Sequence, residues 1–232
     1  DLLALGIVAD VATQTGDTRY YLQRGLAQLR RTPRIGLQTL YKAAELADPS
    51  QIDETHIGFS LAPRLNAIGR LGDANPMVDL LTTADPVVAR SLVGELESLN
   101  ARRRLLTDQI YRAALALLDQ NPNLAETPVL VLMGKDWPGG GIGLVAGRLA
   151  NQFQKPVLLL SERDDGRAGG SPRSIDGVNI TAALAENAAL LTNFGGHPMA
   201  AGVALPARDV ESLRRGLNAS VARQLAELTQ PP

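Results

Sequence analysis

The sequence has no cysteine, few aromatic residues and only two histidines, and each shortage excludes a class of site. Without cysteine there are no disulfides and no thiolate metal ligands, which fits a cytosolic protein. The two histidines are His56 and His197, so a metal centre rich in histidine cannot be built from this chain. Aromatic residues make up 3% of the sequence, so the core must consist of Leu, Val, Ile and Ala.

Long apolar runs are missing as well. No stretch reaches the roughly 18 consecutive apolar residues that a membrane span needs. The first apolar run, residues 2–8, has no basic flank and stops before Asp10, unlike a signal peptide. Because the chain opens with Asp1 directly before this run, we expect it to be a piece cut from a longer protein. Its 232 residues suffice for one large domain or two modest ones.

The net charge is −1, so no basic field covers the whole chain. The basic residues are nevertheless skewed, with 20 Arg among the 23 Lys and Arg residues. The planar fork of arginine binds phosphate through two hydrogen bonds. A genome rich in G and C produces the same skew, so the composition leaves both explanations open.

Helical patterns dominate the first half. Apolar residues three or four apart predict helices near residues 19–30 and 35–46. Asp85-Pro86 is a helix start and Asn121-Pro122 a stop, which together predict one helix of about 34 residues and about 50 Å. A helix of that length suits a connection between two domains. Residues 102–104, three arginines within it, indicate either a solvated face or a patch that meets phosphate.

The second half predicts a compact α/β domain. A buried strand at 128–133, a glycine turn at 139–141, a helix at 142–153 and a second strand at 156–160 form a βαβ unit with a parallel strand pair. Further along we expect a helix at about 179–191, a short strand at 203–205 and a last helix at about 209–228. The predicted domains are therefore residues 1–85, a linking helix at 86–121, and residues 122–232.

Two motifs in the first half carry candidate site residues. Asp10 ends an apolar run, where a carboxylate either binds a metal or an arginine or serves as an ordinary cap. In residues 62–70, Arg64 and Arg70 flank Asn66 between a proline and a glycine. We interpret this stretch as a turn that could present its polar side chains to a phosphodiester, or as a plain surface loop.

Two glycine-rich motifs lie in the second half. Ser171 and Arg173, at positions i and i+2, share one face of an extended strand and could clamp a phosphate together. His197 follows Gly195 and Gly196 and could hydrogen-bond a phosphate or a base. A structural hairpin and a turn histidine are the alternatives that the residues alone leave open.

Taken in order, these segments resemble one family. Residues 195–202 resemble the GGHxxAAG signature of the DHH-associated nucleic-acid-binding domain. Residues 3–11 are similar to the segment ALGTVADV of RecJ-type single-stranded-DNA exonucleases, in the DHH phosphoesterase superfamily. Residues 63–70 resemble the stretch PRLNAAGR of that family, residues 142–149 its GIVASRL helix, and residues 171–174 its SxRS strand.

The resemblance implies a fold and an activity. The fold would be α/β: the tail of a DHH domain, a long connecting helix, and a mixed-sheet DHH-associated domain. The activity would be 5′→3′ hydrolysis of single-stranded DNA in cytoplasmic DNA repair and recombination, with Mn²⁺ or Mg²⁺ held mostly by ligands outside this chain. The implied partners are the 5′-phosphate end of single-stranded DNA, single-strand-binding protein and repair helicases, with no membrane.

The resemblance also implies roles for single residues. Asp10 matches a catalytic aspartate that binds metal, and Arg64, Asn66 and Arg70 match a motif that contacts the DNA end.

In the second half, Ser171 and Arg173 match the group that holds the 5′-phosphate. His197, with Gly195 and Gly196, matches the glycine motif near the nucleotide.

The sequence departs from the family in two respects. Residues 137–141 lack the histidine that often follows Trp137 and have Gly141 in place of valine, which we expect to loosen that turn. The DHH triplet and the other aspartates are not among these residues, and we expect the OB-type domain to be missing or displaced, so we expect the chain alone to bind DNA weakly and not to cleave it. The alternatives are a phosphoesterase for oligonucleotides or cyclic dinucleotides, a non-catalytic nucleic-acid-binding module, and a tRNA-editing accessory domain.

Overall fold

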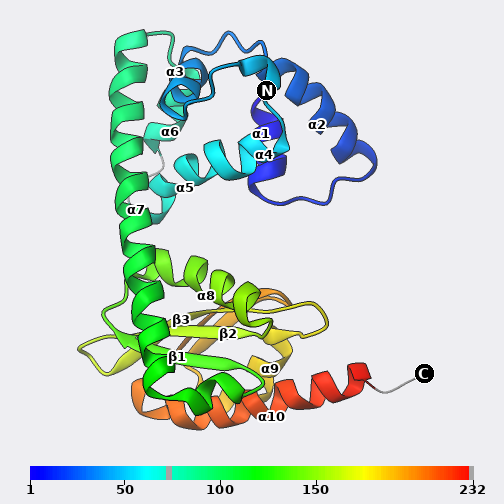
Figure 1. The fold of residues 1–232 in the computed structure, drawn as a ribbon, viewed down its shortest axis with the longest axis vertical. Helices are drawn as coiled ribbons and strands as arrows, with labels where there is room; N and C mark the ends of the chain where they lie inside the picture. The colour runs from blue at the N-terminus through cyan, green and yellow to red at the C-terminus, as the bar shows by residue number, and fades with distance from the viewer. Residues whose placement is uncertain (72–74, 230–232) are drawn as a thin grey trace. The chain divides into compact units, whose positions relative to one another are not determined.

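The structure is a computed structural model that describes residues 1–71 and 75–229. The side chains of Arg70, Leu71 and Thr229 lie outside the described part. The chain forms two compact units, Asp1–Arg104 and Leu105–Pro232. The boundary between the units falls inside one long helix, visible in Figure 1.

In its described residues, the regular secondary structure of the first unit is all helical. Its helices are α1 (Leu2–Ala9), α2 (Gly16–Leu29), α3 (Ile35–Ala43), α4 (Glu54–His56), α5 (Ala62–Leu71), α6 (Asn75–Thr82) and the first part of α7 (Pro86–Gln120), with a 3-10 helix at Pro49–Gln51 and a π-helix at Ile57–Leu61. The predicted helices at 19–30 and 35–46 are confirmed as α2 and α3. Aliphatic side chains fill the core; Leu22, Leu29, Leu37, Leu40 and Leu61 are fully buried in it.

The segment from 62 to 70 is helical, which corrects the predicted turn. Helices α4 and α5 and the π-helix between them follow one another without a break. Pro63 lies in the first turn of α5, where its missing N–H and its ring disturb regular α-helical bonding. A π-helical turn just before it is a known way to absorb such a defect. The helical segment thus continues through Pro63, with the π-helical turn directly before it.

Helix α7 confirms the predicted start and stop. The Asp85 carboxylate accepts hydrogen bonds from the backbone N–H groups of Val87 at 2.7 Å and Val88 at 3.4 Å, so it caps the helix as expected. The helix has 35 residues, about 52 Å at 1.5 Å per residue. In the described residues, no helix is long and apolar enough to cross a membrane.

The second unit is built on a five-stranded mixed sheet. Its strands are β1 (Leu130–Lys135), β2 (Val157–Glu162), β3 (Arg167–Arg173), β4 (Asn193–His197) and β5 (Ala200–Pro206). They lie in the order β1-β2-β3-β5-β4, and only the β1–β2 pair is parallel. The predicted βαβ unit is confirmed, but the prediction missed β4, which forms a hairpin with β5.

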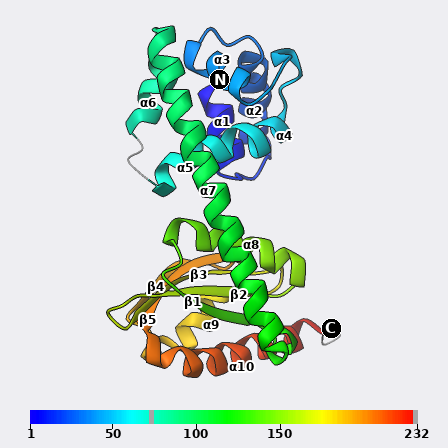
Figure 2. The same cartoon turned by 60° about the vertical axis from the view of Figure 1, so that its left-hand side comes forward.

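Helices cover both faces of this sheet. Helix α8 (Gly139–Phe153) lies on one face, while α9 (Ile180–Glu186) and α10 (Val210–Thr229) lie on the other, as both views show (Figure 2). Short 3-10 helices occur at Pro122–Glu126, Ala188–Leu190 and Ala207–Asp209. The alternation of side chains divides the core accordingly. Leu130, Leu132 and Leu159 pack on the α8 face, and Val131, Leu158 and Leu160 on the opposite face.

The three glycines at 139–141 belong to α8, which corrects the predicted glycine turn. Gly141 is buried, and a Cβ at this position would lie 2.9 Å from Cδ1 of Ile110 on α7. The glycine therefore does not loosen a turn. It lets the first turn of α8 approach the part of α7 that belongs to the same unit.

Candidate nucleic-acid interface

Ser171 and Arg173 form a pair on the α8 face of β3. Nη1 of Arg173 donates hydrogen bonds to Oγ of Ser171 and to the Pro172 carbonyl oxygen, each at 2.7 Å. The Ser171 hydroxyl is also 3.4 Å from the Ala201 carbonyl oxygen, to which it donates. A hydroxyl and a guanidinium thus lie side by side, as strand alternation predicts.

Helix α8 makes space for this pair through a glycine. A Cβ on Gly143 would lie 2.7 Å from Nη2 of Arg173 and 3.0 Å from Oγ of Ser171. One turn later, a Cβ on Gly147 would meet Cγ of Arg173 at 3.9 Å, an ordinary contact. The backbone of α8 therefore holds the Arg173 side chain in place along its length. Sequence reasoning did not identify Gly143; the available signal was the four-residue spacing of Gly139, Gly143 and Gly147 on one helix face.

His197 lies in the same row of the sheet as Arg173. Both residues are register partners of Ala200, one on each side, so the side chains of all three share a face. Two strand spacings separate His197 from Arg173, roughly 10 Å. His197 is exposed, and its backbone carbonyl accepts a hydrogen bond of 2.7 Å from Oγ1 of Thr181. The histidine is thus fixed through its backbone, and its ring is open to a ligand.

The glycines next to His197 have two different roles. Gly196 has a φ of 151°, and a Cβ there would lie 2.4 Å from the Ala200 carbonyl oxygen, so the hairpin requires glycine. Gly195 and Gly202 are register partners, and each has open space where a Cβ would be. Gly169 on β3 is equally open but lies one row away, opposite Ala204 on β5; we call these three glycines on neighbouring strands the glycine strip.

A hollow of about 440 Å³ lies against β4 and β5. It is lined by Gly170, Asn193, Phe194, Gly195, Gly202, Val203 and Ala204. Glycines at these positions allow a ligand to approach the backbone closely.

The turn between β2 and β3 is fixed by a local ion pair. Asp165 accepts hydrogen bonds from the Arg167 side chain at 2.7 Å and from the Arg167 backbone N–H at 3.0 Å. These two bonds lower the pKa of the Asp165 carboxyl. The Arg167 side chain is therefore paired with Asp165 within this turn.

In the first unit, Asp10 is exposed at the C-terminal cap of α1. It is therefore not a buried carboxylate that requires a partner, as its place after an apolar run suggested. The next residue, Val11, has a φ of 54° and a side chain that is 88% exposed. A β-branched residue rarely adopts this conformation, so the backbone beside Asp10 is strained. Among the described residues, no three His, Asp or Glu side chains are grouped so that they could hold a metal ion.

The motif on α5 places its polar residues differently. Nε of Arg64 donates to Oε1 of Glu97 at 2.6 Å, and Nη1 donates to the Ser60 carbonyl oxygen at 2.7 Å. The Arg64 side chain is only 12% exposed, whereas Asn66 is exposed. The Arg70 side chain lies outside the described residues. Arg64 thus ties α5 to α7, and Asn66 is available to a ligand.

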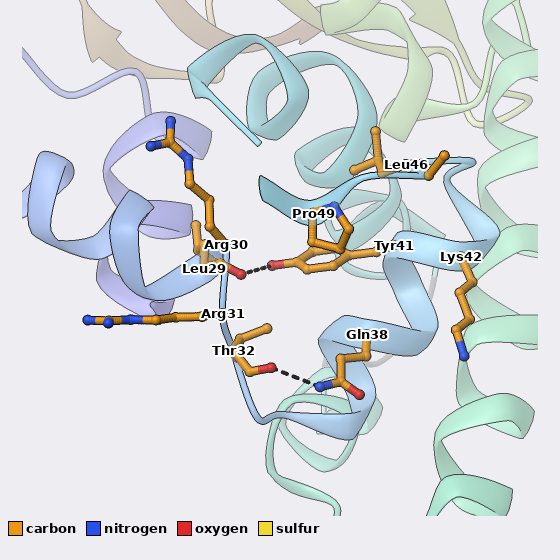
Figure 3. A pocket seen from close by; sticks show the side chains of 10 residues that line it. Leu29, Arg30, Arg31, Thr32, Gln38, Tyr41, Lys42, Leu46 and Pro49 are labelled. Atoms are coloured by element: carbon orange, nitrogen blue, oxygen red, sulfur yellow. Dashed lines mark hydrogen bonds between the residues drawn. The ribbon is translucent and has the colours of Figure 1, made fainter. Parts of the chain in front are cut away.

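The first unit also has a pocket of about 480 Å³ beside Tyr41, shown in Figure 3. The Tyr41 hydroxyl donates to the Leu29 carbonyl oxygen at 3.2 Å, and burial raises the pKa of Tyr41 to about 12. Three basic residues, Arg30, Arg31 and Lys42, line this pocket, but their charged ends point in three different directions (Figure 3). They do not converge on one anion.

The second unit resembles a known domain family. Residues 126–223, which contain the mixed sheet with α8, α9 and most of α10, match the model of the DHHA1 domain. This match covers the Ser171–Arg173 pair, the His197 hairpin and the glycine strip.

Over nearly its whole length the chain is homologous to RecJ. It is 39% identical to the single-stranded-DNA-specific exonuclease RecJ of Bacillus subtilis over 98% of this chain, and 33% identical to that of Thermus thermophilus over 96%. It spans 29% and 31% of the length of these two relatives.

Solved RecJ structures agree with the fold. The crystal structure of RecJ from Thermus thermophilus with Mn²⁺ matches at a TM-score of 0.82 and 33% identity, over 95% of this chain and 32% of that one. Another RecJ structure bound to manganese matches at a TM-score of 0.76 and 33% identity, over 97% of this chain and 56% of that one. The expected RecJ resemblance and fold class are thereby confirmed, and the roles of single site residues stay predictions.

Proposed function

We propose that this chain is the part of a 5′→3′ single-stranded-DNA exonuclease that holds the 5′-phosphorylated end of the strand. The observation that carries this proposal is the Arg173–Ser171 pair, fixed against Gly143 of α8 and in one row with His197. A guanidinium beside a hydroxyl offers several donors to one phosphate. The bare glycine strip next to the pair would let the sugar–phosphate backbone lie close to the sheet.

The residues of the first unit would contact the strand near the bond that is cleaved. We assign Asn66 as the exposed contact and Arg64 as the group that positions α5 through Glu97. Asp10 fits a divalent cation as one oxygen ligand, but the described residues do not supply enough ligands for a metal site. We therefore derive no hydrolytic step from this chain, and we expect it to bind DNA without cleaving it.

The remaining features of the whole protein rest on similarity to RecJ. We propose manganese as its metal, single-strand-binding protein and repair helicases as its partners, and DNA repair and recombination in the cytoplasm as its setting.

The test is binding to labelled single-stranded oligonucleotides followed by fluorescence anisotropy. The same sequence is compared with a 5′-phosphate and a 5′-hydroxyl at one fixed salt concentration, because phosphate contacts depend steeply on salt. We expect tighter binding of the phosphorylated strand, and loss of that preference in Arg173→Ala. Arg167→Ala is the matched control, because Arg167 is on the same strand but paired with Asp165.

Two results would contradict the proposal. Equal affinity of the wild-type chain for the 5′-phosphate and 5′-hydroxyl strands would show that this chain has no binding site for the 5′-phosphate. Shortening of the oligonucleotide by the pure chain with Mn²⁺ would show that it is catalytic after all. Strong competition by short dinucleotides, with weak binding of long strands, would favour a phosphoesterase for small substrates.

A further inference from the structure

A second pocket lies next to the Arg173–Ser171 pair. It has a volume of about 540 Å³ and is bounded by the segment after β1, the first turn of α8, and strands β2 and β3. Ser171 lines this pocket with the same side chain that accepts a hydrogen bond from Arg173. A group bound at Arg173 would therefore lie next to a group that fills the pocket.

One wall of the pocket is Trp137. Its indole lies directly against Gly134: a Cβ on Gly134 would be 2.1 Å from Cε2 and 2.5 Å from Nε1 of the ring. The glycine thus lets the indole pack on the strand backbone, which fixes its position. The residue is half-buried and lines the pocket. A fixed aromatic ring beside an open volume is a stacking surface for another flat ring.

The pocket also contains a buried hydroxyl without a partner. Ser161 is 8% exposed, and its hydroxyl has no hydrogen-bond partner among the described residues. Its register partners are Gly134 on β1 and Gly169 on β3, so neither partner has a side chain beside it, and on the β1 side the Trp137 indole occupies that space. Every fully enclosed side-chain polar atom in the described part has a partner, so the Ser161 oxygen must open into the pocket. A nearly buried hydroxyl of this kind is expected to bind a polar group of a ligand.

The charges at the pocket favour a neutral ligand group. Asp136 and Arg163 both line it, both are exposed, and their formal charges cancel. The remaining lining consists of Trp137, Ile142, three glycines and the two serines Ser161 and Ser171. A second phosphate would meet the Asp136 carboxylate, whereas an uncharged heterocycle would meet an aromatic wall and one hydroxyl.

We propose that this pocket, the Trp137 pocket, binds the base of the terminal nucleotide whose 5′-phosphate is held by Ser171 and Arg173. The proposal rests on the proposed function, because the phosphate site places the base. The base stacks on the indole, and one polar atom of its edge bonds to the Ser161 hydroxyl. Stacking accepts all four bases, since each has a π-face, so the pocket recognises a nucleotide end without reading its sequence.

The experiment compares two 5′-phosphorylated oligonucleotides that differ only in the first nucleotide, which is either intact or abasic. We expect the wild-type chain to bind the abasic strand about tenfold more weakly, the effect of losing one stacked base. In Trp137→Leu that difference should fall below about twofold, while the preference for a 5′-phosphate over a 5′-hydroxyl remains. In Ser161→Ala the difference should shrink by less than in Trp137→Leu.

A second measurement needs no variant. Trp137 is the single tryptophan of the chain, so its emission reports on the pocket directly. We expect the intact strand to quench this emission at saturation and the abasic strand to leave most of it.

The possible failures are distinguishable. Equal binding of both strands by the wild-type chain, or unchanged emission at saturation, would overturn the Trp137 pocket while a persisting 5′-phosphate preference left the proposed function intact. Absence of that preference would overturn the proposed function itself.

Discussion

Replacing Gly143 with alanine would place a methyl group where the Arg173 guanidinium now lies. The new Cβ would be 2.7 Å from Nη2 of Arg173 and 3.0 Å from Oγ of Ser171. To reach an ordinary contact of 3.4 Å, the guanidinium must move by about 0.7 Å, because 3.4 minus 2.7 is 0.7. The end of an arginine side chain can move that far, but its 2.7 Å hydrogen bond to Ser171 would be lost or distorted.

The two effects of this change have opposite signs. Gly143 lies inside α8, where alanine is favoured over glycine by about 0.8–1 kcal/mol, which by itself would stabilise the chain against unfolding by urea or heat. A hydrogen bond to a charged group contributes about 1.5–3 kcal/mol. Displacing the guanidinium should therefore weaken binding of a 5′-phosphorylated strand roughly 10- to 150-fold relative to the wild-type chain. Because the lost Arg173–Ser171 hydrogen bond opposes the gain in helix propensity, Gly143→Ala should be less stable than Gly147→Ala and defective in recognising the end.

Gly147→Ala is the matched control. It makes the same substitution one turn later in the same helix, and its Cβ would meet only Cγ of Arg173 at 3.9 Å. We expect the gain in helix stability without loss of the hydrogen bond, and an unchanged preference for the 5′-phosphate, measured by urea unfolding and by anisotropy. If Gly143→Ala keeps the full preference for the 5′-phosphate, the packing of Arg173 against Gly143 of α8 has no role in binding.

Three further predictions concern stability. Burial raises the pKa of Tyr41 from 10 to about 12, so the stability that its neutral form contributes is complete below pH 10 and lost as the pH rises through 12; Tyr41→Phe should flatten this loss in urea unfolding, and Tyr21→Phe, at an exposed site, should not. Hydrogen bonding from Ser220 lowers the pKa of Glu186, so its contribution is present above about pH 4.5 and lost as the pH falls further; if Glu186→Gln shows the same acid-side loss as the wild type, this assignment is wrong. Val11→Asn should raise the free energy of unfolding by about 1 kcal/mol, because asparagine tolerates the positive φ and Val11 is exposed; a lower free energy of unfolding would contradict the strain.

The sequence predicted the elements whose signals are local. The capping residue Asp85, the proline after it and the stop at Asn121-Pro122 placed both ends of α7 correctly. Apolar runs followed by glycine placed the parallel β1–β2 pair. The stretch around Pro63 was misread as a turn, because proline normally ends a helix and the compensating π-helix leaves no local signal. Strand β4 was missed because its glycines carry no strand propensity; its pairing with β5 defines it.

The candidate site was predictable where it depends on strand alternation. Ser171 and Arg173, two residues apart on β3, do share one face. The contribution of Gly143 was not predictable, because the contact joins a helix to a strand 28 residues further along the chain, and only the packed structure brings them together. The same is true of Ser161, whose missing partner becomes evident only once its glycine neighbours on β1 and β3 are known.

The bare strip formed by Gly169, Gly195 and Gly202 has a consequence for how this surface can vary. Because no side chain is present, no substitution there can remove a contact; every substitution adds atoms above the sheet. Variation at these positions can therefore only obstruct a strand that lies across them, and it cannot retune which bases are preferred. Binding at this surface therefore stays independent of the base sequence, because any added side chain would obstruct the strand. A preference for particular bases would have to come from the residues around the glycines, which already have side chains.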